Sequence, residues 1–223
     1  MYLSWNKQTV TDFSDENVNT LYDQGYVLTR EHKGAMYQTR SLRIALSEFK
    51  LSSENRRVLK KTEELKLTPF PLPYANYHWS IGKLGKDFYE TKFGKDTFSA
   101  NKIKELLTDP NKSNFNRLFL YEHDELEEIG YSIVRETNAL VHYCYPFYKL
   151  DTPLPNTGLG MMLRAILYAQ GEGKKYIYLG SFQRPSDTYK LQFAGLEWFD
   201  KKGWQNDLNK LKKTLGGSGA IAV

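Results

Sequence analysis

Three closely spaced runs of apolar and alternating residues form the most regular hydrophobic pattern of the chain. They cover residues 117–122, 127–135 and 139–145, and only short polar stretches separate them. Short runs rich in β-branched and aromatic residues are typical of strands, and connections of this length join antiparallel neighbours. The pattern therefore predicts an antiparallel meander over this region.

The pattern changes after the meander. A glycine-containing loop leads into an apolar helical segment that ends near Gly171. A strand over 175–180, a short helix over 186–194, a strand over 196–200 and an amphipathic helix over 204–215 follow. A helix between strands predicts a parallel crossover. We therefore expect an α/β (α+β) fold with the GNAT acyltransferase arrangement, in which helices flank a mixed, mostly antiparallel sheet.

The N-terminal part of the chain has its own strand and helix patterns. Apolar residues alternate over 42–49, which predicts a strand, and Ser52 or Ser53 can cap a helix that runs to about Lys61. The proline-rich stretch 68–73 cannot continue a helix, so we expect an extended connector there. Two further helices are expected, over 80–92 and 99–108.

This connector suggests a division of the chain. We expect an N-terminal extension over 1–73, which packs on an acyltransferase core over 74–215, and a flexible glycine-rich tail over 216–223.

Composition is that of a packed globular protein, with 40% hydrophobic and 26% charged residues in 223. No run approaches eighteen apolar residues and no secretory signal is apparent, so we expect a cytoplasmic protein with no membrane partner. Cys144 is the single cysteine of the sequence. It excludes an internal disulfide and a multi-cysteine metal cluster, and we expect it to be a buried thiol.

A net charge of +5 suits an anionic partner, and the basic residues gather in clusters. Arg56, Arg57, Lys60 and Lys61 occupy two turns of one predicted helix. They form either a cationic edge that grips phosphates or an exposed helix whose arginines pair with neighbouring glutamates.

Gly158, Leu159 and Gly160 directly precede the predicted helix 161–170. The first-turn N–H groups of a helix are unsatisfied and its dipole is positive there, so this segment can hold an anion or a polarised oxygen. Alternatively, the glycines only form the turn and pack it against the sheet.

Residues 174–199 carry a more specific pattern. It consists of a tyrosine-rich strand, Leu179-Gly180, a loop containing Pro185, Tyr189-Lys190, Phe193 and a short closing strand. This pattern resembles the aminoacyl-tRNA–protein transferase family, the arginyl- and leucyl-transferases of the N-end rule. Upstream, Gly158-Leu159-Gly160 is similar to a Ser-Leu-Gly segment of that family. Near the N-terminus, the resemblance rests on Tyr37, Arg43, Phe49 and the segment Ser53-Glu-Asn-Arg56-Arg57-Val-Leu.

The chain also departs from the family pattern. Cysteines usually precede the arginine-containing strand, but Met36-Tyr-Gln-Thr-Arg-Ser41 has none. We therefore expect no metal site. The loop that usually reads Cys-Pro-Lys-Met is Arg184-Pro185-Ser186-Asp187-Thr188 here.

The resemblance implies an enzyme that transfers arginine or leucine from aminoacyl-tRNA to the N-terminal amine of an acceptor protein that begins with Asp or Glu, and so tags it for degradation. Aminoacyl-tRNA is a co-substrate, and no other cofactor is expected. Aminolysis of an ester is downhill, so such an enzyme mainly aligns amine and carbonyl and stabilises the oxyanion.

Candidate residues follow from the resemblance together with this chemistry. Proton donors to the leaving oxygen are Tyr178 and Tyr189, and candidate bases are Asp187 and Glu136. The candidates for binding the donor or the tRNA end are Gly158, Leu159, Gly160, Lys190 and Gln192, and those for binding tRNA are Arg43, Arg56, Arg57 and Lys60. His142, within a strand, is expected to be a hydrogen-bonded structural histidine.

Two other functions remain open. One is an ordinary GNAT acetyltransferase that uses acetyl-CoA, although Asn156-Thr-Gly-Leu-Gly160 lacks the Arg or Gln that usually opens the acetyl-CoA loop. The other is a catalytically silent module that binds tRNA or a protein terminus.

Overall fold

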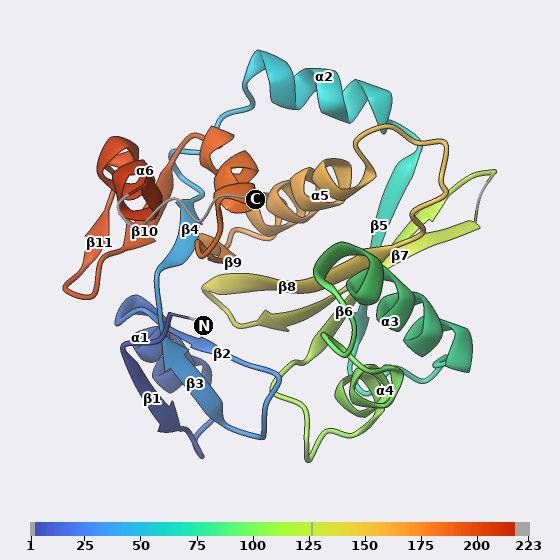
Figure 1. Ribbon diagram of the computed structural model, residues 1–223, viewed down its shortest axis with the longest axis horizontal. Coiled ribbons are helices and arrows are strands. Elements are labelled where there is room, and N and C mark those ends of the chain that lie inside the picture. The colour runs from blue at the N-terminus through green and yellow to red at the C-terminus, as the bar shows by residue number, and fades with distance from the viewer. Residues whose placement is uncertain (1–2, 126, 217–223) are drawn as a thin grey trace.

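The computed structural model of the chain describes residues 3–125 and 127–216 (Figure 1). Its centre is an eight-stranded sheet in the order β11-β10-β4-β9-β8-β7-β6-β5. The strands of this sheet are β4 (Ser41–Ala45), β5 (Leu65–Pro71), β6 (Arg117–His123), β7 (Glu127–Glu136), β8 (Leu140–Tyr148), β9 (Tyr176–Ser181), β10 (Leu196–Phe199) and β11 (Trp204–Gln205).

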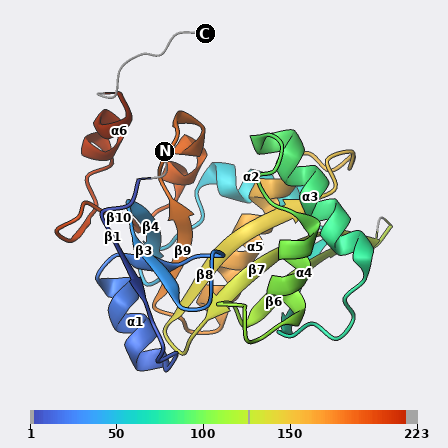
Figure 2. The same cartoon turned by 60° about the horizontal axis from the view of Figure 1, so that its bottom comes forward.

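The N-terminal part of the chain forms a smaller, three-stranded sheet in the order β1-β3-β2 (Figure 1), and Figure 2 shows its strands β1 and β3 beside α1. Its strands are β1 (Asn6–Thr9), β2 (Tyr26–Leu28) and β3 (Ala35–Gln38). The helices of the molecule are α1 (Asp15–Asp23), α2 (Ser53–Lys61), α3 (Trp79–Phe93), α4 (Ala100–Thr108), α5 (Thr157–Gly171) and α6 (Leu208–Gly216), with a 3₁₀ helix over Pro185–Gln192.

Two buried clusters lie on opposite faces of the large sheet. The first packs α2, α5 and α6 against alternate residues such as Val141 and Ile177. The second packs α1, the small sheet, α3 and α4 against the intervening residues, such as Leu140 and Tyr178. Successive side chains of a strand point to opposite faces, so the central strands β6, β7, β8 and β9 contribute to both clusters.

The predicted fold class is confirmed. The β6-β7-β8 meander is antiparallel, α5 follows it, and β9 then pairs in parallel with β8. This mostly antiparallel sheet with one parallel crossover is the GNAT-type arrangement. Cys144 is a buried free thiol, as expected. In the part of the chain described, no helix combines the length and the apolar character that crossing a membrane requires.

Other sequence-based predictions differ from the structure. The stretch expected as a connector is the edge strand β5, and the strand expected over 42–49 ends at Ala45. Both β4 and β5 belong to the first 73 residues, yet they pair with strands from beyond residue 73. The division into extension and core remains a prediction. Except for Gly216, the expected tail lies outside the described residues.

Candidate active-site cleft

A cleft opens where β8 and β9 diverge. The two strands pair only from Leu140↔Tyr176 to His142↔Tyr178, and beyond this point a cavity separates them. It has two compartments of about 560 and 740 Å³. The residues that line both compartments mark their junction: Tyr89, Phe93, Tyr143, Pro146, Met162, Asp187, Tyr189 and Lys190.

A β-bulge in β8 accounts for this divergence. Ser132 on β7 pairs with Pro146 and Ile133 pairs with Cys144, so Tyr145 is the extra residue, and its φ is 35°. A bulge bends the strand that carries it, and the following proline has no N–H to donate to a neighbour. On the opposite wall, Gly180 of β9 has a φ of 78°. Both strands therefore leave the regular sheet at the cleft.

Apolar and aromatic side chains form most of the wall of the first compartment, with Lys92 at its wall and Asp187 and Lys190 at the junction. Its wall includes the first turn of α5, and Asn156 makes no side-chain capping bond to the N–H groups of that turn. These donors therefore remain available to a polar atom of a ligand. A side chain at Gly158 would place its Cβ 2.8 Å from the Tyr148 hydroxyl, so glycine keeps this wall open. The apolar lining includes Phe88, Leu150, Leu154, Leu159 and Met162.

The second compartment carries more charge. Arg30 and Glu31 from the β2–β3 loop line it, together with Arg184 from the loop after β9. With Lys190 and Asp187 at the junction, three cations and two carboxylates face this space. The compartment therefore suits a polar, partly anionic ligand.

Lys190 has a central position. The residue is 8% exposed, and Nζ lies 3.1 Å from the Ser181 carbonyl oxygen and 3.5 Å from Oδ1 of Asp187. Burial lowers the pKa of this ammonium, and Asp187 partly opposes that effect. The structure thus places a desolvated cation at the junction of the compartments.

Asp187, a candidate base, is used to fix the loop. Its Oδ2 accepts hydrogen bonds from the backbone N–H groups of Gln183 and Arg184, both at 2.9 Å, while Oδ1 faces Lys190. This arrangement holds the start of the 3₁₀ helix and orients the ammonium.

The two candidate tyrosines lie in different places. Tyr189 lines both compartments and is 47% exposed. Tyr178 is fully buried in the cluster of α1, does not line the cleft, and receives a hydrogen bond from Arg43 at 3.2 Å. Burial raises the pKa of the Tyr178 hydroxyl. Of the two, only Tyr189 is placed to meet a substrate there.

Glu136 lies outside the cleft lining. Its carboxylate oxygens lie 2.8 Å from Nε of Arg117 and 2.9 Å from Nζ of Lys174. Burial alone would raise its pKa, but the hydrogen bonds from these two cations hold it below the ordinary value. The structure does not bring this carboxylate to the other candidate residues.

The other donor-binding candidates are divided. Gly158 and Leu159 line the first compartment. Gly160 packs against Thr62, and Gln192 accepts a hydrogen bond from Nδ2 of Asn55 on α2 at 3.2 Å. Neither Gly160 nor Gln192 lines the cleft. Both connect the wall of the cleft to α2 and its C-terminal end.

The tRNA-binding candidates also separate into two groups. Arg43 is 5% exposed, pairs with Asp23 and Glu197 at 2.7 Å each, and lies between the rings of Tyr176 and Trp204. It is therefore a buried structural cation.

Arg56, Arg57 and Lys60 lie on α2 and are exposed. Arg56 donates to the Leu51 carbonyl oxygen at 2.6 Å, and Arg57 pairs with Glu54 at 2.5 Å. The C-terminal end of α2 adjoins α5, because Arg164 donates to the carbonyl oxygens of Thr62 and Glu63. The exposed cations of α2 therefore lie on a helix that adjoins α5, whose first turn lines the first compartment.

Sequence reasoning missed three cations of the cleft lining, Arg30, Lys92 and Arg184. Arg30 belongs to a loop with no chemical motif of its own, so only the tertiary structure shows its place. Over residues 3–125 and 127–216, no group of three His, Cys, Asp or Glu side chains is arranged to hold a metal ion.

Comparisons with known proteins agree with the sequence resemblance, although no family model matches the chain. A protein of Parvibaculum lavamentivorans named aspartate/glutamate leucyltransferase is 23% identical over 167 residues, which cover 74% of this chain and 68% of the relative. A protein of the same name from Leptospira interrogans is 25% identical, with coverage of 80% and 72%.

Similarity to solved structures is weaker. The structure of L-PGS from Bacillus licheniformis has a TM-score of 0.49 at 10% identity, and the match covers 90% of this chain and 69% of that one. The curated relatives confirm the predicted similarity to aminoacyl-tRNA–protein transferases over most of the chain, and with it the prediction of an acyltransferase.

Proposed function

We propose that this protein transfers a leucyl group from aminoacyl-tRNA to the N-terminal amine of acceptor proteins that begin with Asp or Glu. The observation that carries the proposal is the two-compartment cleft, in which an apolar space and a cationic space meet at one buried ammonium, that of Lys190. The names of the curated relatives support the choice of leucine and of acidic acceptors.

The first compartment suits the donor. An apolar wall fits a leucyl side chain better than a guanidinium, which would lose hydration there, because the lining carboxylate of Asp187 is already bonded to two backbone N–H groups and faces Lys190. The open N–H groups of α5, at Gly158 and Leu159, face the same space and can bind a polar atom of the aminoacyl ester. Leucine is thus favoured over arginine on physical grounds as well.

The reaction needs little acid–base chemistry. The acceptor amine attacks the ester carbonyl, a C–N bond forms, the C–O bond to the ribose breaks, and the proton of the amine ends on the ribose oxygen. Lys190, at the junction, stabilises the negative charge that develops on the carbonyl oxygen. Tyr189 passes this proton on: its exposed hydroxyl donates a proton to the leaving oxygen and takes up the one that the amine loses.

The tRNA is proposed to follow the basic edge of α2. Arg56, Lys60 and Lys61 are exposed there, and α2 adjoins the helix that lines the first compartment. Phosphate contacts of this kind give salt-dependent affinity. Such substrates belong to the cytoplasm, where the added leucine would mark acceptors for degradation.

A transfer assay tests the proposal. The protein is incubated with radiolabelled Leu-tRNA or Arg-tRNA and with peptides that begin with Asp, Glu or Ala. We expect label from Leu-tRNA on the Asp and Glu peptides. Transfer from Arg-tRNA alone would overturn the choice of leucine. Binding of charged tRNA without transfer would show a silent module. Thermal stabilisation by CoA and not by charged tRNA would favour acetyl transfer.

A further inference from the structure

We infer that Arg30 is the specificity-determining residue that binds the side-chain carboxylate of the acceptor's first residue. This inference rests on the proposed function and assigns the second compartment to the acceptor. Arg30 lines that compartment and is half-buried in its wall. A planar guanidinium offers paired N–H donors in the geometry that a carboxylate accepts.

The guanidinium of Arg30 is held in place by aromatic rings. Its central carbon lies 4.0 Å from the centre of the Phe98 ring and 5.4 Å from that of Tyr145. One terminal nitrogen donates to the carbonyl oxygen of Thr97. The stacking and this single hydrogen bond fix the orientation of the guanidinium. Its other N–H donors remain available to a ligand.

Arg30 forms no ion pair within 3–125 and 127–216, whereas Arg43 pairs with two carboxylates. A half-buried cation without a carboxylate partner at the wall of a cavity attracts one from a ligand more strongly than an exposed cation does. Arg184 also lines the compartment but is exposed, and its guanidinium lies 5.3 Å from the Phe93 ring centre. Arg30 is therefore the better-fixed of the two.

The adjacent carboxylate of Glu31 forms no ion pair with Arg30 within the described residues. It accepts a hydrogen bond from the Tyr37 hydroxyl, and Nζ of Lys7 lies 3.1 Å from the same hydroxyl. The ammonium of Lys7 therefore lies near the Glu31 carboxylate and weakens the repulsion between Glu31 and an incoming carboxylate.

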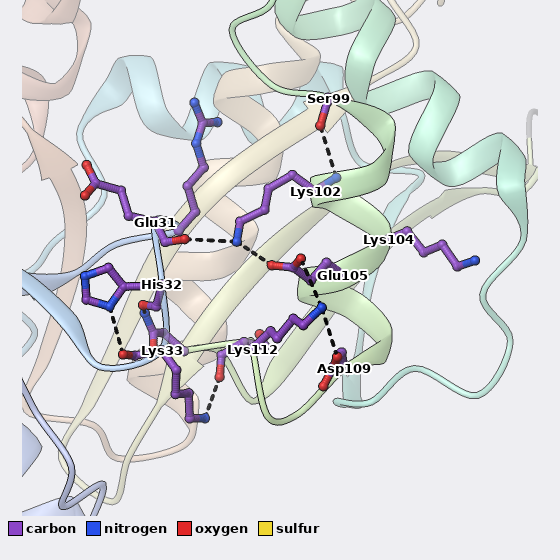
Figure 3. A network of polar contacts seen from close by, with 12 residues as sticks. Glu31, His32, Lys33, Ser99, Lys102, Lys104, Glu105, Asp109 and Lys112 are labelled. Carbon is purple, nitrogen blue, oxygen red and sulfur yellow. Dashed lines mark hydrogen bonds and ion pairs between the residues drawn. The ribbon is translucent and has the colours of Figure 1, made fainter.

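Hydrogen bonds from several other segments hold the β2–β3 loop that carries Arg30. The buried side chain of Asn114 donates to the carbonyl oxygens of Thr29 and His32, at 2.7 and 2.8 Å, and accepts from the N–H of Gly34 at 2.7 Å. Figure 3 shows that Lys102 of α4 also reaches the Glu31 carbonyl oxygen, at 3.1 Å. The N–H of Arg30 itself donates to the Tyr145 hydroxyl at 3.1 Å. The loop is therefore held against the cleft before any ligand binds.

The two compartments share a junction, so this assignment also orients the acceptor. With its side chain on Arg30, the first residue of the acceptor directs its α-amine toward Lys190, where the donor carbonyl lies in the proposed function. Asparagine has the same shape as aspartate but no charge, so the site should discriminate between them.

The test compares wild type and Arg30→Gln with Leu-tRNA and two peptides that differ only in a first residue of Asp or Asn. We expect the kcat/KM of wild type to favour Asp over Asn by about 100-fold, and Arg30→Gln to reduce that preference to less than about 5-fold by losing transfer to Asp. Arg30→Lys, which keeps the charge without the fork, should retain an intermediate preference. The matched control is Lys104→Gln, an exposed lysine of α4 shown in Figure 3, which should keep the wild-type preference.

Three results separate the two claims. If wild type transfers leucine and Arg30→Gln keeps its Asp preference, the role of Arg30 is overturned and the proposed function stands. If Arg30→Gln loses transfer to both peptides by the same factor, Arg30 is not a selector of the side chain. If folded wild type transfers to neither peptide, the proposed function fails first.

Discussion

The hydroxyl of Tyr22 on α1 lies 2.8 Å from Nδ1 of His142 on β8. The same hydroxyl accepts a hydrogen bond from the N–H of Leu28 at 3.3 Å. Both side chains are buried, and burial lowers the pKa of His142 to about 3, with Lys190 adding to the effect. The wall of the cleft thus carries a neutral imidazole near pH 7, tied to the N-terminal helix.

This contact makes the stability of the protein depend on pH. The folded-state pKa of His142 lies below its ordinary value of 6.5, so the unfolded chain binds a proton first as the pH falls. The contribution of the neutral His142 to the free energy of unfolding is therefore complete above about pH 6.5 and is lost as the pH falls toward 3. Roughly 2 kcal/mol of it is lost between pH 7 and 5. Urea unfolding should show that His142→Gln reduces this loss. The exposed His32→Gln control should not, and an equal slope in all three proteins would contradict the assignment.

Lys190 predicts a bell-shaped pH profile for kcat/KM. The rate should rise as the acceptor amine deprotonates, with a pKa of about 7.7–8.0. It should fall again as the ammonium of Lys190 is lost, at a pKa that burial lowers from 10.5. Lys190→Arg keeps its charge and should lack the alkaline limb, while Lys190→Met should lower kcat by about 100-fold. An unchanged alkaline limb in Lys190→Arg would exclude this role.

Gly160 is predicted to be required for the packing of α5 on α2. An added Cβ would lie 2.8 Å from Cγ2 and Oγ1 of Thr62, which is fully buried. Gly160→Ala should therefore destabilise the protein by roughly 1–3 kcal/mol. Gly171, at the other end of the same helix, has open space around it, so Gly171→Ala should be neutral or stabilising. Thermal melts that rank the two variants in the reverse order would be inconsistent with this packing.

Arg43 should matter for stability rather than for tRNA affinity. Its removal leaves Glu197 and the Tyr178 hydroxyl without their partner in a largely buried site. Arg43→Met should lower the free energy of unfolding by roughly 2–4 kcal/mol. Arg56→Gln, on the exposed face of α2, should change it by less than about 0.5 kcal/mol. Denaturant titration measures both, and similar values for the two variants would refute the distinction.

Much of the fold follows from local sequence patterns. The meander over β6, β7 and β8 and the helix after Gly158 are encoded by short-range periodicity, which the sequence reveals directly. The place of β4 between β9 and β10 depends on pairing with residues far along the chain. The prolines of β5 suggested a connector, but an edge strand tolerates them because one side of it makes no ladder bonds.

The candidate site was predicted in part. Asp187, Tyr189 and Lys190 reach the cleft because their segment borders the point where β9 leaves β8. Tyr178 does not, because its neighbours Ile177 and Leu179 face α5 and the alternation of the strand turns Tyr178 to the α1 face. The loop that carries Arg30 has no sequence motif. Its position depends on contacts with Phe98 and Asn114, which lie far along the chain.

The central claim is that donor and acceptor meet between β8 and β9 beside Lys190. The most direct measurement is a crystal structure of the protein with a leucyl-adenosine analogue, in which an amide replaces the reactive ester, and a peptide that begins with Asp. We predict the leucyl side chain among Phe88, Leu154 and Met162, with its carbonyl oxygen about 3 Å from Nζ of Lys190. A leucyl group in the second compartment, or bound outside the cleft, would contradict the account.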